Sequence, residues 1–156
     1  MRSFSYSIFL VDDDEVYLKA LKEYLKQNLG FNVAVFTFSI GEECLQHMNM
    51  KPDVIILDYF LNSTEQTAAN GLDILKKIKI MNSRAQIIML SNQDNMDVAA
   101  NAMKYGAFDY VSKNERAFLK IHNAITGIVS INEMMIQGSE VNMAHFHTEV
   151  KPSRTH

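Results

Sequence analysis

The chain has 156 residues, a length typical of one domain with its own hydrophobic core. Hydrophobic residues make up 47% and charged residues 21%, which excludes a disordered chain, and the net charge of −3 argues against a surface built to bind nucleic acid. The single cysteine, Cys44, excludes an internal disulfide and fits a reducing compartment. With no apolar run near the roughly 18–20 residues of a membrane span and no secretory signal, we expect a cytoplasmic protein with no membrane contact.

Strand-like and helix-like segments alternate along the chain. The apolar run at 6–11 is followed by leucines at helical spacing up to Gly30, and residues 31–38 are β-branched and aromatic. A short helix should begin with Ser39 as its N-cap and Glu42 as the partner in a capping box. The rest of the alternation comprises strands at 52–60, 85–91 and 107–112, helices at 71–81, 95–106 and 115–137, and a polar loop at 62–70.

This alternation predicts an α/β fold, a doubly wound parallel sheet of five strands covered by helices on both faces. The strands support it, because VIIL (54–57) and IIML (87–90) are apolar throughout, as strands buried on both faces are. We expect one domain over residues 1–137, ending in a long helix, and a poorly ordered tail at 138–156, which has no clear periodicity.

Polar side chains follow four of the expected strands where each strand ends. Three aspartates (12–14) follow the first strand, Asp58 the third, Ser91 the fourth and Lys113 the fifth. Since the carboxyl ends of parallel strands meet at one edge of a sheet, where ligands bind, we expect these groups to converge there. Taken alone, each of these residues is an ordinary turn, capping or surface residue. Such a set at the ends of four strands is unusual and indicates a functional site.

The types of residue in this set favour phosphoryl chemistry. Carboxylates without histidine or cysteine partners form a hard oxygen site suited to Mg²⁺, and the cation offsets the repulsion among the aspartates. A lysine and a hydroxyl can hold the remaining phosphoryl oxygens, and a carboxylate can accept the phosphoryl group.

Over roughly residues 5–130 the sequence resembles the receiver domain of bacterial two-component response regulators. The resemblance is carried by an acidic pair, an aspartate ending the third strand, a hydroxyl ending the fourth, a lysine ending the fifth and an aromatic residue three positions earlier: Asp12 and Asp13, Asp58, Ser91, Lys113 and Tyr110. It implies a flavodoxin-like (βα)5 fold with strand order 2-1-3-4-5.

The resemblance also implies roles for these residues. Asp58 would accept phosphate from a sensor histidine kinase, with Lys113 and Ser91 assisting. Asp13, supported by Asp12, would bind Mg²⁺ together with Asp58 and the backbone carbonyl of Phe60. Asp14 lies one position beyond the family pair, in the first turn of the following helix, where its charge favours the helix dipole.

A switch is implied as well, in which Ser91 and Tyr110 respond to phosphorylation and alter a surface for protein partners. Such a domain catalyses only its own phosphorylation and dephosphorylation and is not otherwise an enzyme. The downstream partner stays open, a homodimer is one possibility, and direct binding to nucleic acid is not expected.

The sequence departs from the family pattern at three places. The acceptor strand is followed by no proline, and Asp58 and Gly71 lie further apart than usual. Lys113 is followed by Asn114 where the family has a proline, which leaves the cis or trans state of this bond open, since a non-proline cis bond costs about 3–4 kcal/mol. Ser91 is followed by Asn92 rather than by a very small residue.

Two alternatives remain. A pseudo-receiver would keep the fold as a binding module without phosphorylation. An aspartate phosphatase like those of the haloacid dehalogenase superfamily would use Asp12, Asp14 and Lys113, but it needs acidic ligands after the lysine, and residues 114–156 contain no aspartate. That alternative also leaves Asp58 without a role.

Overall fold

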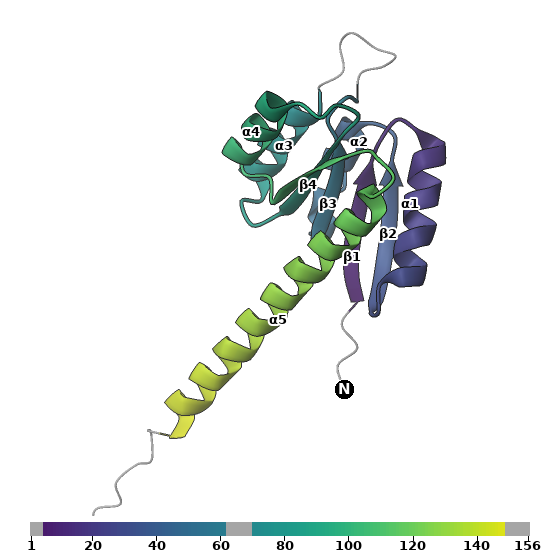
Figure 1. Cartoon of the computed structure of the whole chain (residues 1–156). Coiled ribbons are helices and arrows are strands. Elements are labelled where there is room, and N and C mark those ends of the chain that lie inside the picture. Colours follow the sequence, from purple (N-terminus) through teal and green to yellow (C-terminus); the bar gives the residue numbers. More distant parts are fainter. Residues whose placement is uncertain (1–4, 62–69, 149–156) are drawn as a thin grey trace, which may run out of the picture.

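A parallel sheet of five strands forms the centre of the molecule in the computed structural model, which describes residues 5–61 and 70–148 (Figure 1). The strands lie in the order β2-β1-β3-β4-β5, and every neighbouring pair is parallel. This confirms the doubly wound, flavodoxin-like fold that the sequence predicts. The strands are β1 (Ser5–Val11), β2 (Asn32–Phe38), β3 (Val54–Asp58), β4 (Gln86–Ser91) and β5 (Asp109–Ser112).

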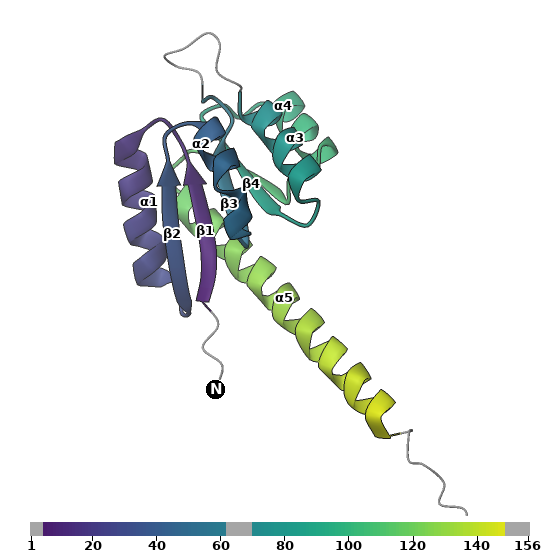
Figure 2. The same ribbon diagram turned by 180° about the vertical axis from the view of Figure 1, so that it is seen from behind.

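Helices cover both faces of this sheet, as Figure 1 and the reverse view in Figure 2 show. One hydrophobic cluster packs α1 and α5 against one face through residues such as Leu21 and Ile125, and the other packs α2, α3 and α4 through residues such as Cys44 and Ile78. Cys44 is therefore a buried structural thiol. The helices are α1 (Glu15–Asn28), α2 (Gly41–Gln46), α3 (Gly71–Met81), α4 (Met96–Lys104) and α5 (Ala117–Thr148), and a 3₁₀ turn (Met48–Met50) follows α2.

Side-chain caps define the start of three helices. The Asp14 carboxylate accepts hydrogen bonds from Val16 N and Tyr17 N, both at 3.0 Å, so Asp14 is the N-cap of α1 rather than a residue of its first turn. Asn70 and Asn95 cap α3 and α4 in the same way. Such caps satisfy backbone N–H groups that have no partner within the helix.

The expected cap of α2 is wrong. This helix begins at Gly41, its N-cap residue is Ile40, and no side chain donates or accepts a capping hydrogen bond there. A Cβ atom on Gly41 would overlap the side chain of Ile74 on α3. Packing between the two helices therefore positions α2, and the capping box expected from Ser39 and Glu42 does not form.

The last helix is longer than expected. Instead of ending near Gln137, α5 continues through Gly138 to Thr148 and projects beyond the sheet (Figure 1). A single glycine costs a helix only about 1 kcal/mol, and no proline follows until Pro152. Much of the stretch expected to form a poorly ordered tail is thus helical, and residues 149–156 lie outside the described residues.

Gly71 holds the start of α3 against the end of β3. Its N–H donates to the carbonyl of Tyr59 at 2.9 Å, and a Cβ atom on Gly71 would lie 2.7 Å from Tyr59 Cα and overlap the carbonyl oxygen of Asp58. Only glycine allows this approach. The two ends of the enlarged connection between Asp58 and Gly71 are therefore held next to each other.

We expect the substitution Gly71→Ala to lower the free energy of unfolding by about 2 kcal/mol or more, because backbone atoms cannot move aside as a flexible side chain could. The matched control is Gly127→Ala in α5, where a Cβ would meet nothing within 4 Å. That substitution should leave stability unchanged or raise it by up to about 1 kcal/mol. Urea denaturation measures both, and equal effects of the two substitutions would contradict the close approach at Gly71.

Candidate functional site

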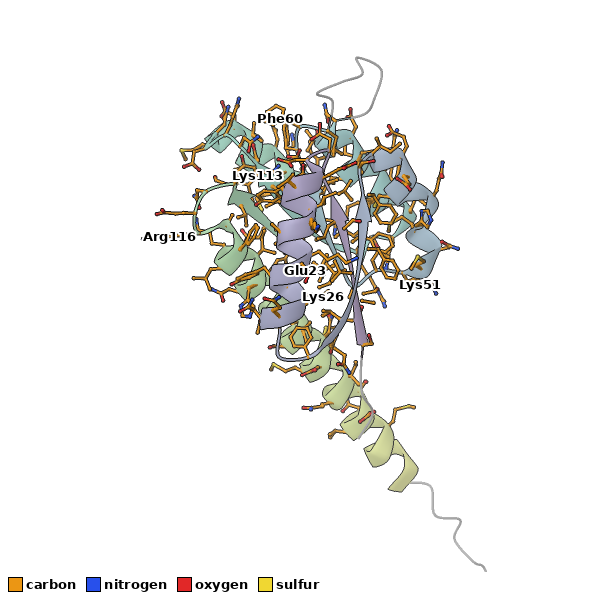
Figure 3. All side chains as sticks on the ribbon, turned by 90° about the vertical axis from the view of Figure 1, so that its right-hand side faces the viewer. Glu23, Lys26, Lys51, Phe60, Lys113 and Arg116 are labelled. Carbon is orange, nitrogen blue, oxygen red and sulfur yellow. The ribbon has the colours of Figure 1, made fainter. Side chains whose placement is uncertain are left out.

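The carboxyl ends of β1, β3 and β5 bring charged side chains together at one edge of the sheet. Asp12 directly follows β1, Asp58 is the last residue of β3, and Lys113 directly follows β5. Lys113 and Phe60, labelled in Figure 3, both lie at this edge. The side chains line a cavity of about 450 Å³ formed by Asp12, Asp13, Asp14, Tyr17, Asp58, Phe60, Asn92 and Lys113.

Lys113 lies between two buried carboxylates. Its Nζ atom is 2.6 Å from Asp12 Oδ2 and 3.5 Å from Asp58 Oδ1. The three side chains are only 8%, 2% and 4% exposed, in the order Lys113, Asp12, Asp58. Ion pairing offsets the cost of removing these charges from water, but one ammonium group serves two carboxylates.

The pKa values of Asp58 and Asp12 reflect this shortage of positive charge. Burial raises the pKa of Asp58 from 3.8 to about 6; the negative charge of Asp12 adds to the rise, while Lys113 and a backbone hydrogen bond from Phe60 oppose it. Burial likewise raises the pKa of Asp12, against the lowering effect of Lys113. The site therefore favours any additional positive charge.

The carboxylates are placed to hold a cation. Among the described residues, one oxygen atom from each of Asp12, Asp13 and Asp58 lies within 4.8 Å of the others. Asp58 Oδ1 is buried without a hydrogen-bond donor. An all-oxygen set with no nitrogen or sulfur ligand fits Mg²⁺. Phe60 lines the same cavity, and the role of its carbonyl oxygen as a fourth protein ligand stays a prediction.

Ser91 and Tyr110, the two expected switch residues, are connected through the backbone of Gln93. Ser91 is fully buried at the end of β4 and is not part of the cavity lining; its Oγ accepts a hydrogen bond from Gln93 N at 3.1 Å. The hydroxyl of Tyr110 donates to the carbonyl of Gln93 at 2.6 Å. The two side chains thus bind the N–H and the C=O of one residue.

Comparison with known proteins identifies the family. Residues 8–126 match the family model of the response regulator receiver domain. The chain belongs to the response regulator receiver family.

Curated relatives of this receiver domain are longer proteins. The transcriptional regulatory protein CssR of Bacillus subtilis is 32% identical over 109 residues, which cover 70% of the chain and 45% of CssR. A putative NtrX-like response regulator of Rickettsia felis is 34% identical over 107 residues, or 68% of the chain and 21% of that protein. The chain thus spans less than half the length of these relatives.

Solved structures confirm the receiver fold. The signal receiver domain of a putative LuxO repressor protein from Vibrio parahaemolyticus superposes with a TM-score of 0.72 at 21% identity, covering 86% of this chain and 97% of that one. A response regulator receiver domain from Clostridium thermocellum gives 0.70 at 27% identity, covering 83% and 98%.

Tyr17 is a residue of the site that the sequence reasoning missed. Lys113 Nζ lies 4.6 Å from the centre of the Tyr17 ring, within the range of a cation–π interaction, and the ring also packs edge-on against Phe118. Burial raises the pKa of Tyr17 to about 12, with the negative charges of Asp12 and Asp58 adding to the rise. Tyr17 lies in the first turn of α1, three residues after the N-cap Asp14, and this closeness to the aspartates was the signal that could have indicated it.

Two departures from the family pattern now have a structural description. No cis peptide bond occurs within residues 5–61 and 70–148, so the bond between Lys113 and Asn114 is trans. The Asn114 side chain accepts a hydrogen bond from Arg116 N at 2.9 Å and so supports the turn into α5. Asn92 lines the cavity, where the family has a very small residue.

The raised pKa of Asp58 predicts how stability changes with pH. Because the folded-state pKa of about 6 exceeds the unfolded value of 3.8, folding favours the protonated form. In metal-free buffer this contribution is fully present below about pH 4 and is lost as the pH rises through 6. Relative to Asp58→Asn, the wild type should therefore lose about 2–3 kcal/mol of unfolding free energy between pH 4 and pH 8.

Urea denaturation of both proteins in EDTA across this range measures the difference, and curves that stay parallel would contradict it. With Mg²⁺ at pH 8 the wild type should recover part of the loss, because the ion binds only the folded state. Asp13→Ala should recover less.

Proposed function

We propose that this receiver domain accepts a phosphoryl group on Asp58 in a Mg²⁺-dependent reaction. The donor would be the phosphohistidine of a sensor histidine kinase or a small molecule such as acetyl phosphate. The observation that supports this proposal is the placement of Asp58, buried 3.5 Å from the Lys113 ammonium and within 4.8 Å of the Asp12 and Asp13 oxygens.

Asp58 would act as the nucleophile. Its carboxylate oxygen forms a bond to phosphorus while the bond from phosphorus to the donor's nitrogen or oxygen breaks, and the electron pair leaves with the donor. A pKa of about 6 keeps most of the carboxylate ionised at neutral pH. Bound Mg²⁺, held by Asp12, Asp13 and Asp58, would supply positive charge to the phosphoryl oxygens.

Lys113 would supply the second positive charge. It contacts Asp12 more closely than Asp58, at 2.6 Å against 3.5 Å. When a cation neutralises Asp12, the ammonium group is freed to pair with a phosphoryl oxygen on Asp58. The Tyr17 ring under Lys113 limits where the ammonium can go, so the lysine is partly positioned before the reaction.

The same proposal includes a switch. A phosphoryl oxygen on Asp58 would attract the Ser91 hydroxyl, which then no longer accepts the hydrogen bond from Gln93 N. Gln93 can move once that bond is lost, and with it the carbonyl that holds the Tyr110 hydroxyl. The surface formed by α4 and β5 would change as a result, and a downstream protein would recognise the change.

The pseudo-receiver remains the alternative, since it needs the same fold without the reaction. The presence of Asp13, Asp58, Ser91 and Lys113 favours the phosphorylated form over this alternative. An aspartate phosphatase is not proposed, because the chain belongs to the receiver family and Asp58 would have no part in that reaction.

We expect Asp58→Asn to abolish labelling by radioactive acetyl phosphate, because the amide is nearly isosteric with the carboxylate but is not a nucleophile. Asp97→Asn, which changes an acidic residue in the first turn of α4, is the matched control and should label like the wild type. Labelling should also require Mg²⁺. Full labelling of Asp58→Asn would contradict the acceptor assignment, whereas an unlabelled wild type would favour the pseudo-receiver.

The switch is tested by hydrogen exchange with beryllofluoride as a phosphoryl mimic. The wild type should change its amide exchange within residues 91–112, while Tyr110→Phe, which lacks the hydrogen bond to Gln93, should exchange faster around Gln93 before the mimic is added. Loss of one hydrogen bond worth about 1 kcal/mol should raise the amide exchange rate about fivefold. Exchange that is identical with and without the mimic would show that this switch does not operate.

A further inference from the structure

The hydroxyl of Tyr17 is buried in the site without a hydrogen-bond partner. Within residues 5–61 and 70–148, the other buried side-chain oxygens that lack one are Asp12 Oδ2 and Asp58 Oδ1, and both of these contact the Lys113 ammonium. Buried polar groups in proteins are nearly always hydrogen-bonded, so an exception needs an explanation. All three side chains line the same cavity, so the explanation lies in that site.

Two packing contacts hold the Tyr17 ring in place. Lys113 Nζ lies 4.6 Å from the ring centre, and the ring of Phe118 packs edge-on with its centre 5.5 Å away. The backbone is held as well, because Tyr17 N donates to the N-cap Asp14 at 3.0 Å. A ring held in this way cannot swing freely, so the position of its hydroxyl is set before any ligand binds.

The surroundings of the hydroxyl favour an incoming acceptor. Burial and the charges of Asp12 and Asp58 raise the pKa of Tyr17 to about 12, so the hydroxyl keeps its proton at neutral pH and can donate it. The hydroxyl lies near enough to both carboxylates for their charges to act on it, but it donates to neither. Lys113 has only donors. A ligand that brings an oxygen acceptor to the ring would satisfy the hydroxyl.

We propose that the Tyr17 hydroxyl donates a hydrogen bond to a phosphoryl oxygen on Asp58. The inference rests on the proposed phosphorylation of Asp58 and adds a residue that contacts the transferred group. Because the Lys113 ammonium lies against the Tyr17 ring, an oxygen that pairs with Lys113 comes within reach of the hydroxyl of that ring. An anionic oxygen accepts more than one hydrogen bond, so the hydroxyl adds to the contacts of Lys113, Ser91 and Mg²⁺ and replaces none of them.

A neutral donor suits this position better than a second cation. The ammonium group of Lys113 already pairs with Asp12 and Asp58, and another positive side chain would stabilise the unphosphorylated site in the same way. A hydroxyl that finds no acceptor until the phosphoryl group arrives stabilises only the phosphorylated state and the transition state that leads to it. The cost is one buried hydroxyl without a partner in the unphosphorylated protein.

Removing the hydroxyl should therefore have different effects on the two states. Tyr17→Phe keeps the ring against Lys113 and Phe118, since a phenylalanine ring also attracts a cation. In the unphosphorylated protein the substitution removes no hydrogen bond, so the urea midpoint should stay the same or rise. Beryllofluoride with Mg²⁺, which mimics the phosphoryl group on Asp58, should bind about tenfold more weakly, because a hydrogen bond to a charged acceptor is lost.

Fluorine NMR measures this affinity and also reports the contact itself. In Tyr17→Phe the resonance of one bound fluorine should shift more than the others, since only that fluorine accepts the hydroxyl in the wild type. Tyr24→Phe is the matched control, because Tyr24 lies on the same helix with its ring 5.3 Å from that of Phe118 but does not line the cavity. It should bind beryllofluoride like the wild type.

Mg²⁺ alone, followed through its effect on the urea midpoint, should bind the wild type and Tyr17→Phe equally. A weaker metal response of Tyr17→Phe, or a lower urea midpoint without ligand, would show that the hydroxyl has a partner before phosphorylation and would overturn the proposal. Equal beryllofluoride affinity of the wild type and Tyr17→Phe, or an equal loss in Tyr24→Phe, would overturn it and leave the acceptor role of Asp58 intact. A wild type that binds no beryllofluoride would overturn both.

Discussion

The structure depends on a buried charge imbalance at the carboxyl edge of the sheet. Lys113 contacts Asp12 and Asp58 at once, and one ammonium group cannot neutralise two carboxylates that are both almost fully buried. An apolar cluster of the same size would be more stable. The raised pKa of Asp58 means that keeping this carboxylate ionised lowers the stability of the folded domain. Perturbed groups of this kind are typical of reactive sites.

Much of the surrounding fold serves to hold these charges in place. The apolar strands fix the positions of Asp12 and Asp58, since VIIL and its neighbours are packed on both faces. Asp14 caps α1 and so directs the chain away from the acidic pair. Gly71 lets α3 approach the backbone of Asp58. The proposed switch would act at the remaining side of the site, through the hydrogen bonds of Ser91 and Tyr110 to Gln93.

The sequence was sufficient to predict the strands, their parallel arrangement and the side chains at their ends, because buried strands and terminal polar residues leave a local pattern. It was not sufficient where packing between distant segments decides. The close packing of Gly41 against Ile74 sets the start of α2, and nothing in the neighbouring sequence indicates that contact. The end of α5 was predicted too early because residues 138–148 have no clear apolar periodicity, although the helix continues through them. Tyr17 belongs to the site only because α1 places its ring against Lys113.

The contacts of Tyr17 also connect the charge site to the long helix. Its ring lies under Lys113 and packs against Phe118 in the first turn of α5, so the lysine and the helix share one packed cluster. Contact alone does not transmit a change, since coupling needs an element with two discrete arrangements that both sites bias. In the proposed switch the bonds from Ser91 and Tyr110 to Gln93 would be such an element near β5, formed before phosphorylation and broken after it. The proposed switch would therefore run from Ser91 through Gln93 to Tyr110 and the surface of α4 and β5, whereas the contacts of Tyr17 hold Lys113 against the first turn of α5.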